Sequence, residues 1–279
     1  MISSGTSNLR TRLRDREVVV GSFVNLGSSL NAEIMGIAGF DWLVFDLEHG
    51  AGDELSLVAQ LQAVTHTGTG ALVRVEGIEP ARILHALDLG ADGVLVPRLH
   101  SADDARRCVE CCRYAGSRGV ARYNRSWHWG LAQRTMDEAD AAVVCAVQIE
   151  TAEALDAVEE IAAVEGVDIL FVGPVDLAHA LGLNCAPDDP RLLEHAKRVA
   201  AAAAANGISA GMLVGTVAQA RAYQELGFNF VGCASDSGLL ANGARGLCGQ
   251  LRELSAPAIA AGAGQVDGAS PRPSGEASP

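Results

Sequence analysis

Three ionisable residues follow one short apolar run and mark the first place where this chain could do chemistry. The run ends in the letters VFDLEHG, which place Asp46, Glu48 and His49 directly after a stretch typical of a buried strand. Histidine titrates near neutral pH, so His49 is a natural general base. An ordinary polar loop after a strand is the alternative interpretation of this segment when it is taken alone.

Polar side chains end other apolar runs in the same way. Arg74 lies at the end of ALVRV, Gln148 and Glu150 at the end of CAVQIE, and Asp176 at the end of GPVD. Two carboxylates, with water and substrate oxygens in the remaining places, suit a hard divalent cation, Mg²⁺, Mn²⁺ or Co²⁺. The planar fork of an arginine matches a carboxylate or a developing oxyanion.

These residues also have a structural interpretation. Glu150 and Asp176 can cap the helices that follow them, and Arg74 can form an ion pair with Asp46 or Glu48. The joint occurrence of these groups at the ends of several runs favours the functional interpretation, in which they share one site.

Short apolar runs alternate with helical segments, a pattern typical of βα units around a parallel sheet. The runs predict eight strands, at residues 18–24, 42–46, 71–75, 93–96, 143–149, 168–172, 209–214 and 230–233. A 3.6-residue periodicity predicts helices at 53–66, 80–89, 102–114, 152–164, 190–206 and 217–226. The prediction is an α/β fold, a (β/α)8 TIM barrel in a single domain, with the site at the carboxyl ends of its strands. An open doubly wound sheet is the alternative, but no glycine-rich phosphate loop follows the first strand.

The remaining segments complete the predicted organisation. We expect an N-terminal extension over residues 1–16, a single TIM-barrel domain over 17–254, and a disordered tail over 255–279, where Ala, Gly, Pro and Ser dominate. The long connection from Gly116 to about Ala139 contains Trp127, His128 and Trp129. It predicts a lid at the barrel mouth or a subunit contact.

Composition limits the class of partner. The 34 acidic residues outnumber the 21 basic ones, giving a net charge of −13 that disfavours nucleic acid and anionic membranes. No apolar stretch approaches the roughly 20 residues of a spanning helix, and the N-terminus lacks the apolar core of a signal peptide. We expect a soluble, cytoplasmic enzyme for small molecules, with no organic cofactor. Cys108, Cys111 and Cys112 share a helical face and are interpreted as core thiols, with a soft-metal site as the alternative.

The sequence resembles the HpcH/HpaI family of class II pyruvate aldolases over roughly residues 8–254. The resemblance rests on the ordered segments DWLVFDLEHG, VRV, GADGVLVPRL, GSRG, RSWHWG, VQIETAEAL and GVDILFVGPVDL. It implies a (β/α)8 barrel that forms a homo-oligomer, a trimer or a hexamer built as a dimer of trimers with an exchanged terminal helix. It also implies that Glu150 and Asp176 bind the metal, that Arg74 supports the enolate oxygen, and that Gln148 lies near metal and substrate. The main-chain amides of Val175 and Asp176 would receive the pyruvate carboxylate.

The resemblance further implies that His49 is the catalytic base and that Asp88 is its partner. From spacing alone, Asp88 on the predicted helix 80–89 is equally a surface acid. The chain departs from the family pattern at Gly50 and Ala51, where Ala-Pro or Gly-Pro is frequent, at GPVD in place of GPAD, and at Tyr114-Ala115-Gly116 in place of YPP. These departures surround the pyruvate pocket and leave the aldehyde open.

The expected reaction is metal-dependent reversible aldol cleavage of a 4-hydroxy-2-oxo acid to pyruvate and an aldehyde. Oxaloacetate decarboxylation through the same enolate is an alternative, and a non-catalytic ligand-binding barrel is a second one. A Schiff-base aldolase needs a lysine amine. The only lysine, Lys197, lies in the middle of the predicted outer helix 190–206, which argues against that mechanism.

Overall fold

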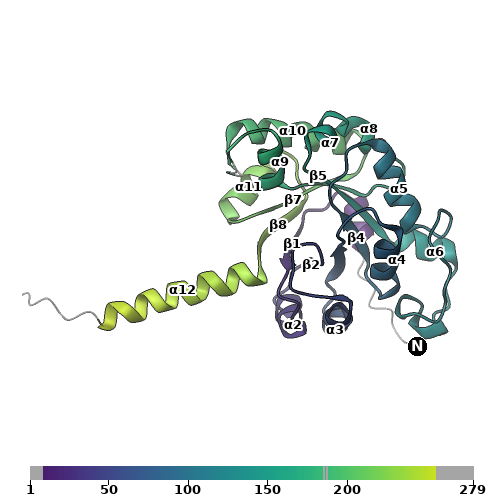
Figure 1. The fold of residues 1–279 in the computed structure, drawn as a ribbon, viewed down its shortest axis with the longest axis horizontal. Coiled ribbons are helices and arrows are strands. Elements are labelled where there is room, and N and C mark those ends of the chain that lie inside the picture. Colours follow the sequence, from purple (N-terminus) through teal and green to yellow (C-terminus); the bar gives the residue numbers. More distant parts are fainter. Residues whose placement is uncertain (1–8, 185, 187, 256–279) are drawn as a thin grey trace, which may run out of the picture. The chain divides into compact units, whose positions relative to one another are not determined.

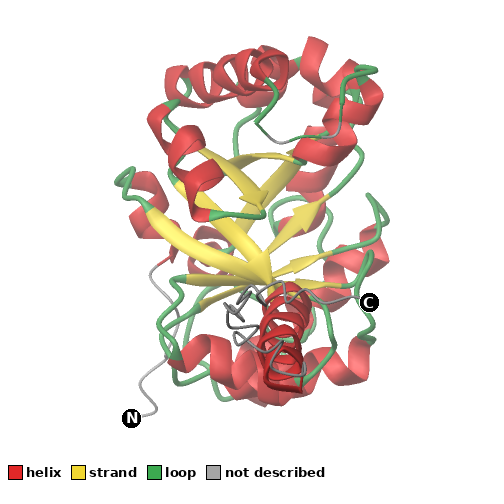
Figure 2. Ribbon diagram, turned by 90° about the vertical axis from the view of Figure 1, so that its left-hand side faces the viewer, coloured by secondary structure: helices red, strands yellow, loops and turns green. Residues whose placement is uncertain are grey.

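The computed structural model describes residues 9–184, 186 and 188–255 and shows a closed barrel of parallel strands surrounded by helices (Figures 1 and 2). The strands follow one another around the barrel in chain order, and the first pairs with the last. They are β1 (Val19–Val24), β2 (Trp42–Asp46), β3 (Gly70–Arg74), β4 (Gly93–Val96), β5 (Val144–Ile149), β6 (Ile169–Val172), β7 (Ser209–Val214) and β8 (Phe230–Ser235). The predicted (β/α)8 barrel is confirmed, and each predicted strand end agrees to within two residues.

Helices connect successive strands. They are α1 (Leu9–Arg14), α2 (Ser29–Ile37), α3 (Glu54–Val64), α4 (Pro80–Asp88), α5 (Ala102–Cys112), the 3-10 helix η1 (Arg125–Gly130), α6 (Met136–Ala142), α7 (Ala152–Asp156), α8 (Val158–Ala162), α9 (Pro174–Ala180), α10 (Pro190–Ala205), α11 (Val217–Glu225) and α12 (Asp236–Ser255). The single helix predicted over 152–164 is two helices, which meet at Ala157 with ψ near 14°. Helices α1, α2, α6 and α12 and the 3-10 helix η1 are additional to the predicted ones.

Aromatic side chains fill the inside of the barrel. Trp42 stacks on Phe230 with ring centroids 3.9 Å apart. A Cβ atom at Gly21 would lie 2.0 Å from the Trp42 ring, so only glycine fits beside it. Leu9 and Leu13 of α1 belong to the same buried cluster. The segment predicted as an N-terminal extension therefore contains a helix that packs into the barrel core.

A second core lies between the strands and the outer helices. Cys108, Cys111 and Cys112 of α5 are buried in it together with Cys145 of β5. Burial raises the pKa of the Cys108 thiol, so it stays protonated and behaves as a small apolar group. These thiols are core residues, and within the described ranges no group of three or more His, Cys, Asp or Glu side chains could hold a metal ion.

The compact unit that contains the barrel comprises residues 1–240, and a second unit, 241–279, contains most of α12. The predicted boundaries at residues 17 and 254 stay predictions. Apart from Ser255, the last residue of α12, the predicted disordered tail lies outside the described residues. Among the helices of the described chain, none has the length and apolarity to cross a membrane.

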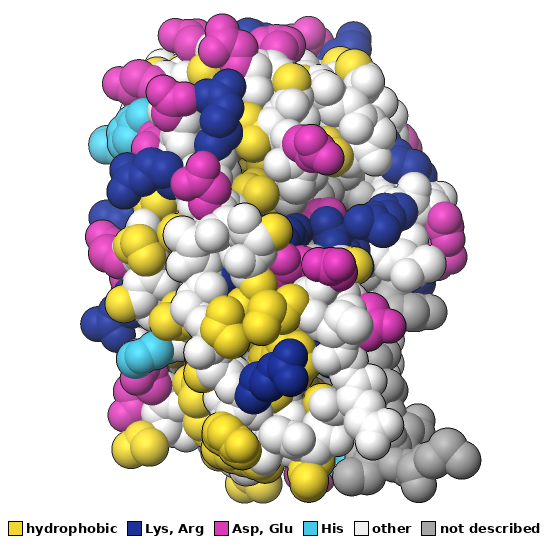
Figure 3. Space-filling view, turned by 90° about the vertical axis from the view of Figure 1, so that its right-hand side faces the viewer, with side chains coloured by type: hydrophobic (Ala, Val, Ile, Leu, Met, Phe, Trp, Pro, Cys, Tyr) yellow, Lys and Arg dark blue, Asp and Glu magenta, His cyan; other side chains and the backbone are white. Residues whose placement is uncertain are grey.

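The long connection with the tryptophans leads from α5 to β5, so it lies at the amino-terminal end of the strands. Arg125 of η1 donates a hydrogen bond to the Leu89 carbonyl, just ahead of β4, at 3.0 Å. The prediction of a lid over the chain's own site is wrong, because hydrogen bonds from Arg125 to the Leu89 carbonyl and to Thr65 Oγ1 hold the connection at the amino-terminal end of the strands. On the side that carries α5 and α6, hydrophobic patches lie among charged side chains (Figure 3). Val120, Tyr123, Trp129 and Leu131 of this connection are exposed.

Candidate active site

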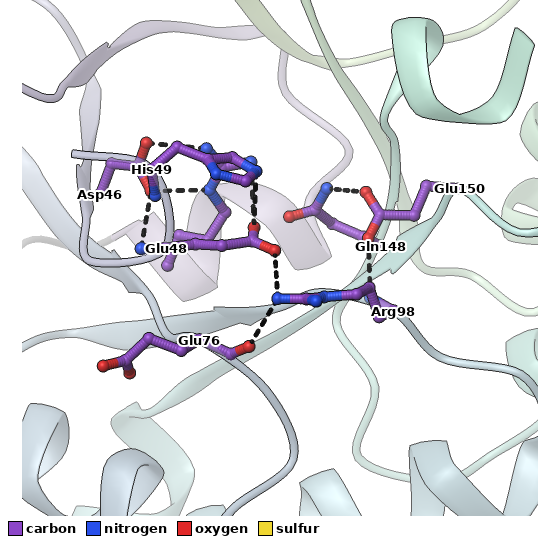
Figure 4. A network of polar contacts seen from close by, with 8 residues as sticks. Asp46, Glu48, His49, Glu76, Arg98, Gln148 and Glu150 are labelled. Carbon is purple, nitrogen blue, oxygen red and sulfur yellow. Dashed lines mark hydrogen bonds and ion pairs between the residues drawn. The ribbon is translucent and has the colours of Figure 1, made fainter. Parts of the chain in front are cut away.

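The mouth of the barrel gathers most of the predicted residues at the carboxyl ends of its strands. Asp46 ends β2 and Arg74 ends β3, while Gln148 lies in β5 with Glu150 just after it. Asp176 lies in the first turn of α9, which follows β6. Parallel strands bring these residues to one edge although they are far apart in the sequence, and Figure 4 shows part of the resulting polar network.

Asp46 and Arg74 form a two-pronged ion pair at the base of the site. Arg74 donates from Nε to Asp46 Oδ1 at 2.9 Å and from Nη2 to Oδ2 at 2.7 Å. Burial would raise the pKa of Asp46, but the hydrogen bonds and charge of Arg74 hold it below its usual value. Asp46 Oδ1 also accepts the main-chain N–H groups of Glu48 and His49. The ion pair weighed as the structural interpretation of Arg74 exists, and it fixes the guanidinium at the mouth.

Glu48 connects three cationic or basic groups. Its carboxylate lies 3.4 Å from Arg74 Nη1, 2.9 Å from Arg98 Nη2 and 3.8 Å from His49 Nε2. The Glu48 side chain is buried, whereas 67% of the His49 side chain is exposed. The main chain of His49 is held by Asp46, and its exposed ring can contact a ligand from the solvent side (Figure 4).

Glu150 and Gln148 form the buried wall of the site. The Gln148 side-chain nitrogen donates to Glu150 Oε2, and the main-chain N–H of Arg98 donates to Oε1 at 2.7 Å. Gln148 is 1% exposed, yet its Oε1 has no hydrogen-bond partner within the described chain. A Cβ atom at Gly173 would lie 2.8 Å from Glu150 Oε2, so glycine at this position leaves room for the carboxylate.

The surroundings of Glu150 disfavour the charged form of its carboxylate. Burial raises the pKa of Glu150 to about 7, and the negative charges of Asp176 and Glu48 act in the same direction. A divalent cation between Glu150 and Asp176 would remove this repulsion and keep both carboxylates ionised. Two carboxylates beside an unpartnered amide oxygen form a donor set that Mg²⁺ and Mn²⁺ accept, so the residues fit the metal that the resemblance implies.

The first turn of α9 offers main-chain donors beside the same carboxylates. Val175 and Asp176 occupy positions in this turn, where helical N–H groups have no partner in their own helix. The N-cap residue, Gly173, makes no side-chain capping bond. The N–H groups of Val175 and Asp176 therefore remain available to an anion.

Two residues of the sequence argument lie elsewhere. Asp88 ends α4 at the amino-terminal side of the barrel, where its carboxylate accepts a hydrogen bond from Arg118 Nη2 at 2.9 Å. Within one chain the structure does not bring Asp88 to His49, because α4 runs antiparallel to its strands and ends at their amino-terminal side, so the pairing of the two residues stays a prediction. Lys197 is exposed on the outer helix α10, away from the mouth.

Sequence reasoning gave no role to two residues of the mouth. Arg98, directly after β4, contacts Glu48 through its side chain and Glu150 through its main chain. Asn25, directly after β1, has a buried side-chain oxygen without a partner in the described part of the chain. Their position after predicted strands was a signal for both. The left-handed backbone of Arg98, with φ of 58°, is not visible in a sequence.

Comparison with known proteins identifies the family of the chain. The family model described as HpcH/HpaI aldolase/citrate lyase matches residues 20–243. A hydroxypyruvate/pyruvate aldolase of Paraburkholderia phytofirmans is 36% identical over 243 residues, covering 84% of this chain and 94% of that protein. A 5-keto-4-deoxy-D-glucarate aldolase of Salmonella paratyphi C is 37% identical and covers 83% and 91%, respectively. The crystal structure of an HpcH/HpaI aldolase/citrate lyase family protein from Burkholderia cenocepacia superposes with a TM-score of 0.84 at 36% identity, covering 88% of this chain and 100% of that one.

The chain belongs to the HpcH/HpaI aldolase/citrate lyase family, which confirms the resemblance inferred from its segments. It is an aldolase of this family, an enzyme of the lyase class. The residues matched by the family model, 20–243, include those of the mouth described above.

Proposed function

We propose that the protein catalyses metal-dependent reversible aldol cleavage of a 4-hydroxy-2-oxo acid to pyruvate and an aldehyde. One observation carries the proposal: Glu150, Asp176 and the unpartnered Gln148 Oε1 lie together beside the fixed guanidinium of Arg74. The names of the relatives, a hydroxypyruvate/pyruvate aldolase and a 5-keto-4-deoxy-D-glucarate aldolase, support the class of reaction.

The substrate has a natural orientation in this arrangement. Its carboxylate accepts the main-chain N–H groups of Val175 and Asp176, as anions do at helix N-termini. Arg74, held in place by Asp46, uses guanidinium N–H groups that its contacts with Asp46 and Glu48 leave over to stabilise the negative charge that develops on the 2-oxo oxygen during cleavage. A divalent cation held by Glu150 and Asp176 supplies Lewis-acid stabilisation of the same oxygen when it is bound.

His49 moves the proton. In cleavage it accepts the proton of the 4-hydroxyl as the bond between C3 and C4 breaks, the electron pair of that bond remains on pyruvate as the enolate, and the aldehyde leaves. Addition of a proton from solvent to C3 of the enolate then completes pyruvate. In synthesis His49 returns its proton to the new hydroxyl. The Glu48 carboxylate lies 3.8 Å from His49 Nε2, beside the ring that carries the proton between these steps.

The direct test is condensation of pyruvate with a panel of aldehydes, with product identified by mass. Activity in Mg²⁺, Mn²⁺ or Co²⁺ that disappears in EDTA and returns with added metal supports the proposal. Activity that survives EDTA contradicts it. Treatment with pyruvate and borohydride leaves the chain unmodified, whereas an adduct at Lys197 would show Schiff-base chemistry instead.

Oxaloacetate decarboxylation is a second candidate, because Arg74, Glu150 and Asp176 would stabilise the same enolate. Incubation with oxaloacetate and metal, with and without an aldehyde, separates the two reactions. We also propose that the enzyme is a homo-oligomer, a trimer or hexamer. The exposed side chains Trp129 and Leu131 support a contact between copies at the α5–β5 connection.

A further inference from the structure

We propose that Arg98 selects aldehydes that carry a second anionic group, a carboxylate near the aldehyde carbon. The inference rests on the proposed aldol function and adds the class of the acceptor. It comes from the different states of the two arginines that face the mouth. The Arg74 side chain is largely buried and held by Asp46 and Glu48, whereas the Arg98 side chain is exposed to solvent.

The main chain of Arg98 is fixed relative to the reacting centre. It follows Pro97 at the end of β4 and adopts φ of 58°, in the left-handed region that residues with a Cβ atom rarely occupy. Such a conformation persists only where its surroundings hold it. Here the N–H of Arg98 donates to Glu150 Oε1 at 2.7 Å. The main chain from which the Arg98 side chain extends is therefore hydrogen-bonded to Glu150, the carboxylate proposed to bind the metal.

The guanidinium of Arg98 has donors to spare. Among the described residues its side-chain contacts come from Nη2, which lies 2.9 Å from Glu48 Oε1 and donates to the Glu76 carbonyl at 3.1 Å. The side chain is 61% exposed, against 12% for Arg74. Nε and Nη1 thus remain for a ligand, and Figure 4 shows the group extended between Glu48 and Glu76. An arginine fork with free N–H groups binds oxyanions.

The distance between the two arginines limits the length of the acceptor. Arg74 Nη1 lies 3.4 Å from one oxygen of the Glu48 carboxylate, and Arg98 Nη2 lies 2.9 Å from the other. The two guanidinium groups are therefore separated by a single carboxylate. A short aldehyde that reacts with the pyruvate enolate beside Arg74 would present to Arg98 a carboxylate one to three carbons from its carbonyl carbon.

The test compares matched acceptors with pyruvate and metal: glyoxylate against glycolaldehyde, and succinate semialdehyde against butanal. We expect the wild-type kcat/KM to favour the anionic member of each pair. Arg98→Met should lower that preference about 30-fold, mainly through KM of the anionic aldehyde, and Arg98→Lys should lower it less. Arg106→Met, at an exposed arginine of α5, is the matched control and leaves the preference unchanged.

Equal loss with anionic and neutral aldehydes in Arg98→Met overturns the proposal, since it would show that Arg98 acts only by holding Glu48 or Glu150. A wild type without preference for anions overturns it as well. Deuterium exchange into the methyl group of pyruvate, measured without aldehyde, distinguishes the failures. Exchange without anionic preference contradicts only the role of Arg98, and absence of exchange contradicts the proposed function on which it rests.

Discussion

The two ends of the barrel treat their acidic side chains in opposite ways. At the amino-terminal end, the aspartates that immediately precede β2, β4 and β6 each accept a main-chain N–H from the neighbouring strand: Asp41 from Val20 at 2.8 Å, Asp92 from Ala71 at 2.8 Å and Asp168 from Cys145 at 2.9 Å. Arg12 and Arg10 of α1 complete two of these sites by pairing with Asp41 and Asp168. These acids are satisfied by the fold itself.

At the carboxyl-terminal end, several buried polar atoms have no hydrogen-bond partner among the described residues. Four buried side-chain oxygens lack a hydrogen-bond partner among the described residues, and three of them, in Asn25, Glu76 and Gln148, lie at the ends of β1, β3 and β5. Burial and neighbouring acids raise the pKa of Glu150 to about 7. Buried polar groups are normally hydrogen-bonded. The buried oxygens without a partner at this end are therefore suited to contact a ligand. Substitutions at the two ends should therefore separate activity from stability.

Glu150→Gln should have the largest effect, because it removes a proposed metal ligand and leaves the fold intact. We expect kcat/KM for aldol cleavage to fall by a factor of about 10³ or more, with no loss of thermal stability, since glutamine carries no buried charge. Steady-state kinetics and thermal unfolding measure the two effects. Glu153→Gln, at an exposed position on α7, is the control. Retained activity in Glu150→Gln would remove Glu150 from the metal site.

Arg74→Lys should lower kcat by a factor of about 10² to 10³, equivalent to about 3 to 4 kcal/mol. Lysine keeps the charge near Asp46 but loses the planar fork that holds two contacts and presents a third N–H group. Kinetics at saturating substrate measure this effect, with Arg82→Lys on the exposed face of α4 as the control. Equal kcat in Arg74→Lys and wild type would show that Arg74 is only an ion-pair partner.

Asp168→Asn should act on stability instead. It removes the charge that pairs with Arg10 at 2.9 Å in a largely buried position and leaves that cation unpaired, at a cost of about 3 kcal/mol. Denaturant unfolding measures the loss. The kcat/KM of the folded variant should stay within about twofold of wild type, and a large catalytic defect would contradict the division between the two ends.

The metal-free protein should lose stability as pH rises. The pKa of Glu150 is about 7 in the folded chain and 4.5 without burial, so between these values the folded state binds more protons than the unfolded one. The free energy of unfolding then falls as pH rises from about 4.5 through 7, by at most about 3 kcal/mol. Denaturant unfolding in EDTA at several pH values measures the slope. It should exceed the slope of Glu150→Gln, and identical slopes would contradict the raised pKa.

The sequence predicted the barrel and most of the mouth because both depend on local pattern. Apolar runs located all eight strands, and position after a strand placed Asp46, Arg74, Gln148, Glu150 and Asp176 at one end. The sequence did not show which end of the barrel a residue late in a helix or in a long connection occupies, or which backbone conformation a residue adopts. The α5–β5 connection and Asp88 lie at the other end because helices run antiparallel to strands, and the role of Arg98 depends on a left-handed backbone that no periodicity reveals.

The most direct test of the central claim needs no knowledge of the aldehyde. If Glu150, Asp176 and Arg74 stabilise the pyruvate enolate with a divalent cation, the enzyme should exchange the methyl protons of pyruvate with deuterium in D₂O, as observed by NMR. The account predicts exchange in Mg²⁺ or Mn²⁺, none in EDTA, and none above background in Glu150→Gln. Exchange that persists in EDTA, or that stays intact in Glu150→Gln, would contradict it.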